Sequence, residues 1–189
     1  MVANDACSET LIARDDGLLA VIDVQEKLMP VIAQRELVLD NVVRLIKFAE
    51  VIGLPVILTE QENLGATLPE IRDLIPDTRP IPKLVFNCFR SDEFERAVQE
   101  TGRNTLVLTG VETHICVAQT ALHALREFEV HVVSDATSSR TRDNWKGDWR
   151  GGTRPAVTTA SPIWPIKTRT TPMAKRTVLM KVKAFLRRI

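Results

Sequence analysis

The chain has 189 residues, of which 44% are hydrophobic and 26% charged, and its formal net charge is +1. This length and composition are typical of one globular domain, and they exclude a self-repelling disordered chain and a uniformly basic nucleic-acid-binding protein. No apolar stretch approaches the roughly 18 residues that a membrane-spanning helix needs, so no membrane partner is expected. Residues 1–17 contain acids and lack a basic leader region, and three cysteines are too few for a disulfide scaffold. We therefore expect a cytoplasmic protein.

Short apolar runs and amphipathic periods alternate along the first three quarters of the chain. In chain order they predict a strand at 18–23, a helix at 37–52, a strand at 55–59, a short helix at 68–75, a strand at 83–86, a helix at 92–101, a strand at 104–110, a helix at 115–128 and a strand at 130–135. In the last of these helices, Ala118, Leu122 and Leu125 share the predicted apolar face. The alternation predicts an α/β fold, with an open parallel β-sheet and helices on both faces in a Rossmann-like three-layer arrangement.

The composition changes near residue 142. Residues 1–141 contain 13 Lys and Arg against 22 Asp and Glu, a net charge of −9, whereas residues 142–189 contain 12 against 2, a net charge of +10. Residues 142–176 hold all three tryptophans, and their apolar residues follow neither a helical nor a strand period. This pattern predicts loop or disorder, and a helical pattern returns at 173–189. We treat 1–189 as a single domain with an atypical basic segment at 142–176.

Two explanations of the basic segment stay open. One is a reading-frame slip between about codons 145 and 175, which the nucleotide sequence would test. The other is a genuine basic tail that contacts the phosphates and bases of a nucleic acid. No nucleic-acid-binding fold signature accompanies the tail, so a nucleic-acid partner is not expected.

Three chemically capable residues stand where a parallel sheet places its ligand site, outside the carboxyl ends of the strands. Asp23 ends the first predicted strand, Lys83 lies at the third, and Cys116 follows the fourth. Together they can perform covalent catalysis: Cys116 attacks as a thiolate favoured by Lys83 and a helix N-terminus, and Asp23 moves the proton to the leaving group. The backbone N–H groups of Ile115 and Cys116 could hold an oxyanion. Singly, each residue has a structural interpretation, so this prediction depends on their joint placement.

Five ordered segments resemble the isochorismatase-like cysteine hydrolases. They read LLAVIDVQEKLMP at 18–30, LPVILTEQ at 54–61, KLVFNC at 83–88, GVETHICVA at 110–118 and VHVVSDATSSRT at 130–141. The resemblance covers about residues 16–144 and implies the isochorismatase-like hydrolase fold. It implies that Asp23 is the general acid/base, Lys83 the catalytic lysine and Cys116 the nucleophile. It also implies a non-proline cis peptide bond between Val111 and Glu112, with backbone N–H groups at Glu112, Ile115 and Cys116 facing the oxyanion.

The resemblance implies a hydrolase that cleaves a small amide or related C–N bond through a thioester, and a homo-oligomer. Two alternatives are kept: a catalytically silent oligomeric module, and isochorismatase-type hydrolysis of a small metabolite. Nicotinamidases of the family carry an Asp-x-His metal motif after the second strand, where this chain has TEQE at 59–62, so neither metal nor cofactor is expected. Cys88, His123 and His131 are expected to be structural. The candidate pocket residues are Gln25, Glu60, Gln61, Phe86, Thr113 and His114.

Overall fold

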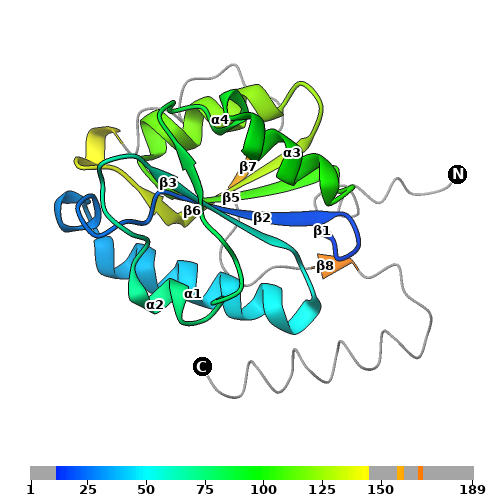
Figure 1. Cartoon of the computed structure of the whole chain (residues 1–189), viewed down its shortest axis with the longest axis horizontal. Helices are drawn as coiled ribbons and strands as arrows, with labels where there is room; N and C mark the ends of the chain where they lie inside the picture. The colour runs from blue at the N-terminus through cyan, green and yellow to red at the C-terminus, as the bar shows by residue number, and fades with distance from the viewer. Residues whose placement is uncertain (1–11, 145–156, 160–165, 168–189) are drawn as a thin grey trace, which may run out of the picture.

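The computed structural model describes residues 12–144, 157–159 and 166–167 (Figure 1). A twisted sheet forms its centre, with α1 (Arg35–Ile52) and α2 (Pro69–Arg72) on one face. The other face is covered by α3 (Asp92–Glu100) and α4 (Ala118–Ala124). No helix in these residues has the length and apolar character to cross a lipid bilayer.

The main sheet is parallel throughout its described strands. Its spatial order is β4 (Ile81–Lys83), β3 (Val56–Gln61), β2 (Gly17–Ile22), β5 (Thr105–Val111), β6 (Glu129–Ser138) and β7 (Val157–Thr159). A separate parallel pair joins β1 (Ile12–Ala13) to β8 (Ile166–Lys167). The predicted α/β architecture, a parallel sheet with helices on both faces, is therefore confirmed.

The sheet separates two apolar cores, and most of β2 and all of β5 are buried on both faces. On one side, α1 contributes Val38, Val42, Leu45, Ile46, Ala49 and Ile52. On the other side, α3 and α4 contribute Phe94, Val98, Ala121 and Ala124. Burial on both faces fixes the central strands, so the residues that follow their carboxyl ends are held on a rigid platform.

Two predicted elements differ from the structure near the carboxyl edge. The strand predicted at 83–86 is β4, which ends at Lys83, because the next two carbonyl groups accept hydrogen bonds from side chains rather than from a neighbouring strand. The helix predicted at 115–128 begins with a π-helical turn, Thr113–Val117, and α4 ends at Ala124. Within α4 the buried residues are Ala118, Thr120, Ala121 and Ala124, so the buried face differs from the predicted one, and Leu122 is 46% exposed and not buried as predicted.

The atypical segment contains structure that the sequence pattern did not predict. Val157–Thr159 forms β7 and pairs in parallel with Val130–Val132 of β6, so the prediction of loop was wrong there and at β8. A valine and two threonines suit a strand, and their pairing covers an edge that β6 would otherwise expose. The remainder of 145–176 and the helix predicted at 173–189 lie outside the described residues.

Candidate active site

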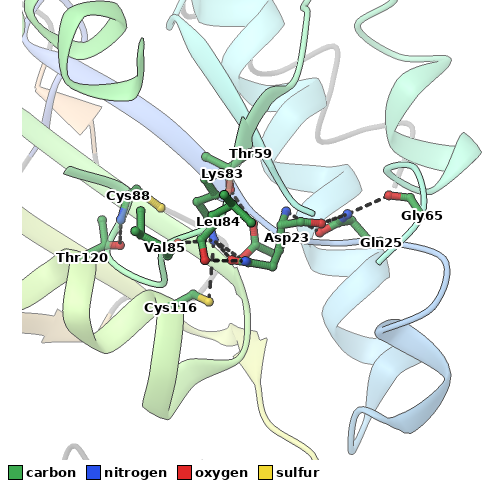
Figure 2. Close-up of polar contacts among 11 residues, drawn as sticks. Asp23, Gln25, Thr59, Gly65, Lys83, Leu84, Val85, Cys88, Cys116 and Thr120 are labelled. Atoms are coloured by element: carbon green, nitrogen blue, oxygen red, sulfur yellow. Dashed lines mark hydrogen bonds and ion pairs between the residues drawn. The ribbon is translucent and has the colours of Figure 1, made fainter. Parts of the chain in front are cut away.

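Asp23, Lys83 and Cys116 meet at the carboxyl edge of the sheet (Figure 2). Asp23 follows β2 directly, Lys83 ends β4, and Cys116 lies in the π-helical turn after β5. Lys83 Nζ lies 2.6 Å from Asp23 Oδ2 and 3.8 Å from Cys116 Sγ. The three residues are 0%, 3% and 6% exposed, respectively. An acid, an amine and a thiol from three distant segments thus form one buried cluster.

The neighbouring strand β3 holds Asp23 by both its backbone and its side chain. Asp23 has a φ of 53°, in the left-handed region that residues other than glycine adopt infrequently. Its N–H donates to the Thr59 carbonyl at 3.3 Å, and the Thr59 hydroxyl donates to Asp23 Oδ1 at 2.7 Å. The sequence reasoning missed Thr59, although it stands at the carboxyl end of the second strand, as Asp23 does at the first.

The Lys83 ammonium has oxygen partners on three sides. It donates to Asp23 Oδ2, to Gln61 Oε1 at 2.8 Å and to the Val85 carbonyl at 3.3 Å. Gln61 in turn donates through Nε2 to the Leu84 carbonyl at 2.9 Å, which fixes its amide. Burial, the largest single effect, would lower the pKa of Lys83, but Asp23, Cys88 and Cys116 together outweigh it and the pKa is raised. Lys83 is therefore a cation throughout the neutral range.

The Cys116 thiol does not have the lowered pKa that the sequence suggested. Burial raises its pKa, and the negative charge of Asp23 raises it further, while Lys83 acts in the opposite direction. The expectation that Lys83 and a helix end would favour a resting thiolate was wrong, because a pattern of residues does not reveal how deeply the sulfur is buried. Cys116 is therefore a protonated thiol at neutral pH, with a carboxylate beside it that can accept the proton.

A close approach of two strands brings the loop of Cys116 next to Asp23. Gly110 pairs with Ile22, the residue before Asp23, and has a φ of 111°. A Cβ atom at Gly110 would lie 2.0 Å from the Ile22 carbonyl oxygen. Only glycine can occupy this position without displacing the backbone that leads to the carboxylate.

The loop between β5 and Cys116 is fixed by hydrogen bonds around Glu112. The peptide bond between Val111 and Glu112 is cis. The Glu112 carboxylate accepts from the backbone N–H of Arg140 at 3.1 Å and lies 3.2 Å from its Nε. The N–H groups of Ile115 and Val117 both donate to the Glu112 carbonyl, at 3.1 and 3.2 Å. The Ile115 N–H, expected to face an oxyanion, therefore already has an acceptor.

Two of the candidate pocket residues hold loops together. Gln25 is fully buried and uses its whole amide on backbone groups. Its Nε2 donates to the carbonyls of Gln61 and Gly65 at 3.0 and 2.7 Å, and its Oε1 accepts from the Gln61 N–H at 2.8 Å. Glu60 accepts from the N–H and the hydroxyl of Thr67 at 2.7 and 2.8 Å. These side chains fasten the 62–68 loop beside the site and have no spare group directed at the thiol.

The other candidate pocket residues differ in exposure. Phe86 is 51% exposed, and it directly follows Val85, whose carbonyl accepts a hydrogen bond from Lys83. Thr113 is fully buried, and within the described residues its hydroxyl has no hydrogen-bond partner. His114 lies with Nδ1 2.9 Å from the Ser139 hydroxyl, so it joins the loop of Cys116 to the end of β6. Gln61, another of the six candidates, contacts the cluster of Asp23, Lys83 and Cys116 directly, through its hydrogen bond from Lys83.

A second thiol lies beside this cluster. Cys88 is fully buried, and burial raises its pKa to about 11, an effect that Lys83 counters and Asp23 reinforces. Both Cys88 and Cys116 are free thiols. Within the described part of the chain, no three His, Cys, Asp or Glu side chains gather in a way that could hold a metal ion.

Comparisons with known proteins agree with the motifs and the fold. A sequence model of the isochorismatase domain matches residues 17–161. The isochorismatase domain-containing protein 1 of Danio rerio is 42% identical over 123 residues, which are 63% of this chain and 43% of that protein, so the chain spans less than half of this relative's length.

Two solved structures of YcaC proteins are similar to this fold over about three quarters of the chain. The Pseudomonas aeruginosa protein, with hexane-2,5-diol and covalent acrylamide, is 28% identical, with a TM-score of 0.70 over 74% of this chain and 73% of that chain. The Escherichia coli protein, described as an octameric hydrolase of unknown specificity, is 28% identical, with a TM-score of 0.70 over 74% of this chain and 72% of that chain. As its five ordered motifs predicted, the chain belongs to the isochorismatase family.

Proposed function

We propose that the protein is a cysteine hydrolase that cleaves a small amide or a related C–N bond through a thioester on Cys116. The observation that carries this proposal is the contact of Lys83 Nζ with both Asp23 Oδ2, at 2.6 Å, and Cys116 Sγ, at 3.8 Å. The Pseudomonas aeruginosa relative is described with covalent acrylamide, which is a reagent for thiols, and this supports a nucleophilic cysteine in a chain of this fold.

The first half of the proposed reaction forms the thioester. Because burial keeps Cys116 protonated, Asp23 accepts the thiol proton as the bond between Sγ and the substrate carbonyl carbon forms. The carbonyl oxygen becomes an oxyanion, for which we assign the Cys116 N–H as donor, since Ile115 and Val117 already donate to Glu112. Asp23 then gives the proton to the leaving nitrogen, the C–N bond breaks, and ammonia or an amine departs.

The second half regenerates the thiol. A water molecule attacks the thioester carbon while Asp23 takes its proton, and the carboxylic acid leaves as the proton returns to sulfur. Throughout both halves, negative charge passes between Asp23 and Cys116, and the Lys83 ammonium lies beside both. Lys83 therefore stabilises each charged stage without moving, which is the electrostatic arrangement that lowers a barrier.

The test is a screen of small primary amides and carbamoyl compounds with Cys116→Ala as the paired variant. The expected result is a loss of about a thousandfold or more in kcat/KM, because the nucleophile is removed. Mass spectrometry of the wild type during turnover should detect an acyl group on the peptide that contains Cys116. Cys88→Ala is the matched control, since it removes a neighbouring buried thiol, and it should retain turnover.

Undiminished turnover in Cys116→Ala would contradict the covalent mechanism. A wild type that hydrolyses none of the compounds and forms no acyl adduct would favour the catalytically silent module. Cleavage of an enol ether with no acyl adduct would favour the isochorismatase-type alternative.

We also propose a homo-oligomer that acts on a small molecule without a cofactor in the cytoplasm. The octameric Escherichia coli relative supports the oligomer. The two described cysteines are free thiols, which fits a reducing compartment.

A further inference from the structure

Two hydrogen bonds outside the catalytic cluster join the segment after Lys83 to the helix after Cys116. The backbone N–H of Cys88 donates to the Thr120 hydroxyl at 3.0 Å. Asn87 Nδ2 lies 3.0 Å from His123 Nδ1. Thr120 and His123 both belong to α4, which continues directly from the turn that carries Cys116. We call the Asn87–His123 contact the joint.

A second hydrogen bond fixes which end of the Asn87 amide faces His123. Its Oδ1 accepts from the Phe89 N–H at 3.1 Å and so caps the 3₁₀ turn Cys88–Arg90. The NH₂ group therefore faces His123, and an NH₂ group only donates. His123 Nδ1 must then be the acceptor, which requires a neutral ring that carries its proton on Nε2.

Protonation of His123 is incompatible with this arrangement. A proton on Nδ1 would face the Asn87 NH₂ donor, and two donors cannot bond. Rotating the amide by half a turn would offer Nδ1 an oxygen but would place NH₂ against the Phe89 N–H and remove the cap. Either orientation of Asn87 leaves one donor unsatisfied when the ring is charged.

The Asn87 amide requires a neutral His123 ring, but other groups around the ring favour a positively charged one. Glu95 of α3 and Glu127, which follows α4, line the same small hollow as His123, together with the uncharged Gln99. The Phe89 ring stacks on the imidazole with centroids 5.1 Å apart and planes 11° apart. Two carboxylates and an aromatic face attract a cation, so a charged ring would gain these contacts at the expense of the joint.

We propose that Asn87 and His123 are positioning residues of the reaction, and that the neutral imidazole holds the lysine-bearing segment against α4. Val85, midway between Lys83 and Asn87, accepts from Lys83 Nζ at 3.3 Å, so movement of this segment reaches the ammonium directly. Lys83 then keeps its contacts to Asp23 and Cys116 only while the joint is closed. The inference rests on the proposed function, and it adds an acid-sensitive element that the catalytic cluster does not contain.

Three variants test the joint. His123→Asn places an amide oxygen near the position of Nδ1, as an acceptor that does not titrate. His123→Phe keeps a stacked ring without an acceptor. Asn87→Asp keeps the cap on Phe89 and offers a second oxygen, which accepts from Nδ1–H of either the neutral or the charged imidazole, so it removes the requirement for an unprotonated Nδ1.

The measurement is the rate of Cys116 alkylation by iodoacetamide, followed by mass spectrometry from about pH 5 to about pH 8, with kcat/KM added on an amide that the screen identifies. Relative to His123→Asn at the same pH, the wild type should lose about fivefold of its rate between the upper and the lower end of this range, because a charged ring cannot accept from Asn87. His123→Phe should be about fivefold slower at every pH. Asn87→Asp, whose carboxylate can bond the ring in both charge states, should show no such acid loss relative to His123→Asn.

Equal rates and profiles in the wild type, His123→Asn and Asn87→Asp would overturn the inference and leave the proposed function intact, provided that Cys116→Ala remains inactive. Should a variant fail to fold, NMR of the His123 ring in the wild type decides independently. The expected tautomer at about pH 8 carries its proton on Nε2, and a proton on Nδ1 would overturn the joint.

Discussion

Each oxygen of the Asp23 carboxylate accepts a hydrogen bond from a neighbouring side chain in the site. Oδ1 accepts from the Thr59 hydroxyl at 2.7 Å, and Oδ2 accepts from Lys83 Nζ at 2.6 Å. The carboxylate is therefore held in one plane while it keeps lone pairs to receive the thiol proton of Cys116. The Thr59 hydroxyl, which takes no part in the proposed reaction, thus sets the orientation of the Asp23 carboxylate that moves the proton.

Replacing Thr59 separates the effect of its hydroxyl from the effect of its shape. Thr59→Val keeps the volume but leaves Asp23 Oδ1 without its donor, so kcat should fall about tenfold with KM little changed. Thr59→Ser restores the hydroxyl and should keep most of the rate. Steady-state kinetics on one amide gives both constants, and a valine variant at the full wild-type rate would show that Lys83 alone holds the carboxylate.

The raised pKa of Cys116 predicts an unusual pH dependence of its alkylation. Because burial and Asp23 raise the pKa, the thiolate fraction at neutral pH is smaller than in a free cysteine. The iodoacetamide rate should therefore keep rising past about pH 8.5, where a free cysteine levels off. Asp23→Asn removes the opposing charge and should react faster at a given pH, whereas Lys83→Met should react more slowly. Peptide mass spectrometry measures each rate, and a plateau near pH 8.5 would contradict the raised pKa.

The sequence was most informative about residues at strand ends. Asp23, Lys83 and Cys116 were predicted together because parallel strands bring their carboxyl ends to one edge. Thr59 stands at the same edge but was missed, since a threonine there is equally typical of any buried strand. The contacts of Gln61 and the burial of Cys116 depend on side-chain directions and packing depth, which a pattern of residue types does not encode.

Among the elements, β5 depends most on a single residue, Gly110. Gly110→Ala would place a Cβ atom 2.0 Å from the oxygen and 2.7 Å from the nitrogen of Ile22, in a conformation with a φ of 111°. We expect a loss of at least about 2 kcal/mol in the free energy of unfolding, because the β2 backbone must move.

Gly102→Ala is the matched control for this variant. Gly102 also has a positive φ, 62°, but a Cβ atom there would meet nothing within 4 Å. Its expected cost is about 1 kcal/mol, which is the conformational penalty alone. Urea unfolding followed by circular dichroism measures the free energy of unfolding of both variants. Equal losses would mean that the Ile22 backbone moves aside without strain.

The sequence predicted the long helices and strands, but it missed the short strands that form only because a neighbouring strand pairs with them. The helix α1 has seven buried positions in 18 residues, so its period is unambiguous. The strands β1 and β7 have two and three residues, too few for a period, and they exist because β8 and β6 pair with them. The beginning of the helix predicted at 115–128 was misplaced because a π-helical turn has no distinctive residue pattern.

For the molecule as a whole, an exposed apolar surface lies next to the catalytic cluster. Leu84 and Phe86 are 69% and 51% exposed, although both are large apolar side chains. They follow β4, which forms an edge of the described sheet. Such a surface beside an open strand edge favours association, and the Escherichia coli relative is octameric. We therefore expect this segment to contact a second copy of the chain.

Light scattering after size-exclusion chromatography tests this contact. The wild type should have a mass that is a multiple of the 21.2 kDa chain. The double variant Leu84→Gln with Phe86→Gln should be smaller, whereas Leu122→Gln, which changes a 46% exposed leucine on α4, should leave the mass unchanged. Because the Val85 carbonyl between the two changed residues accepts from Lys83, dissociation should also lower the hydrolysis rate. A wild type of 21.2 kDa would contradict the oligomer, and an unchanged double variant would assign the contact to another surface.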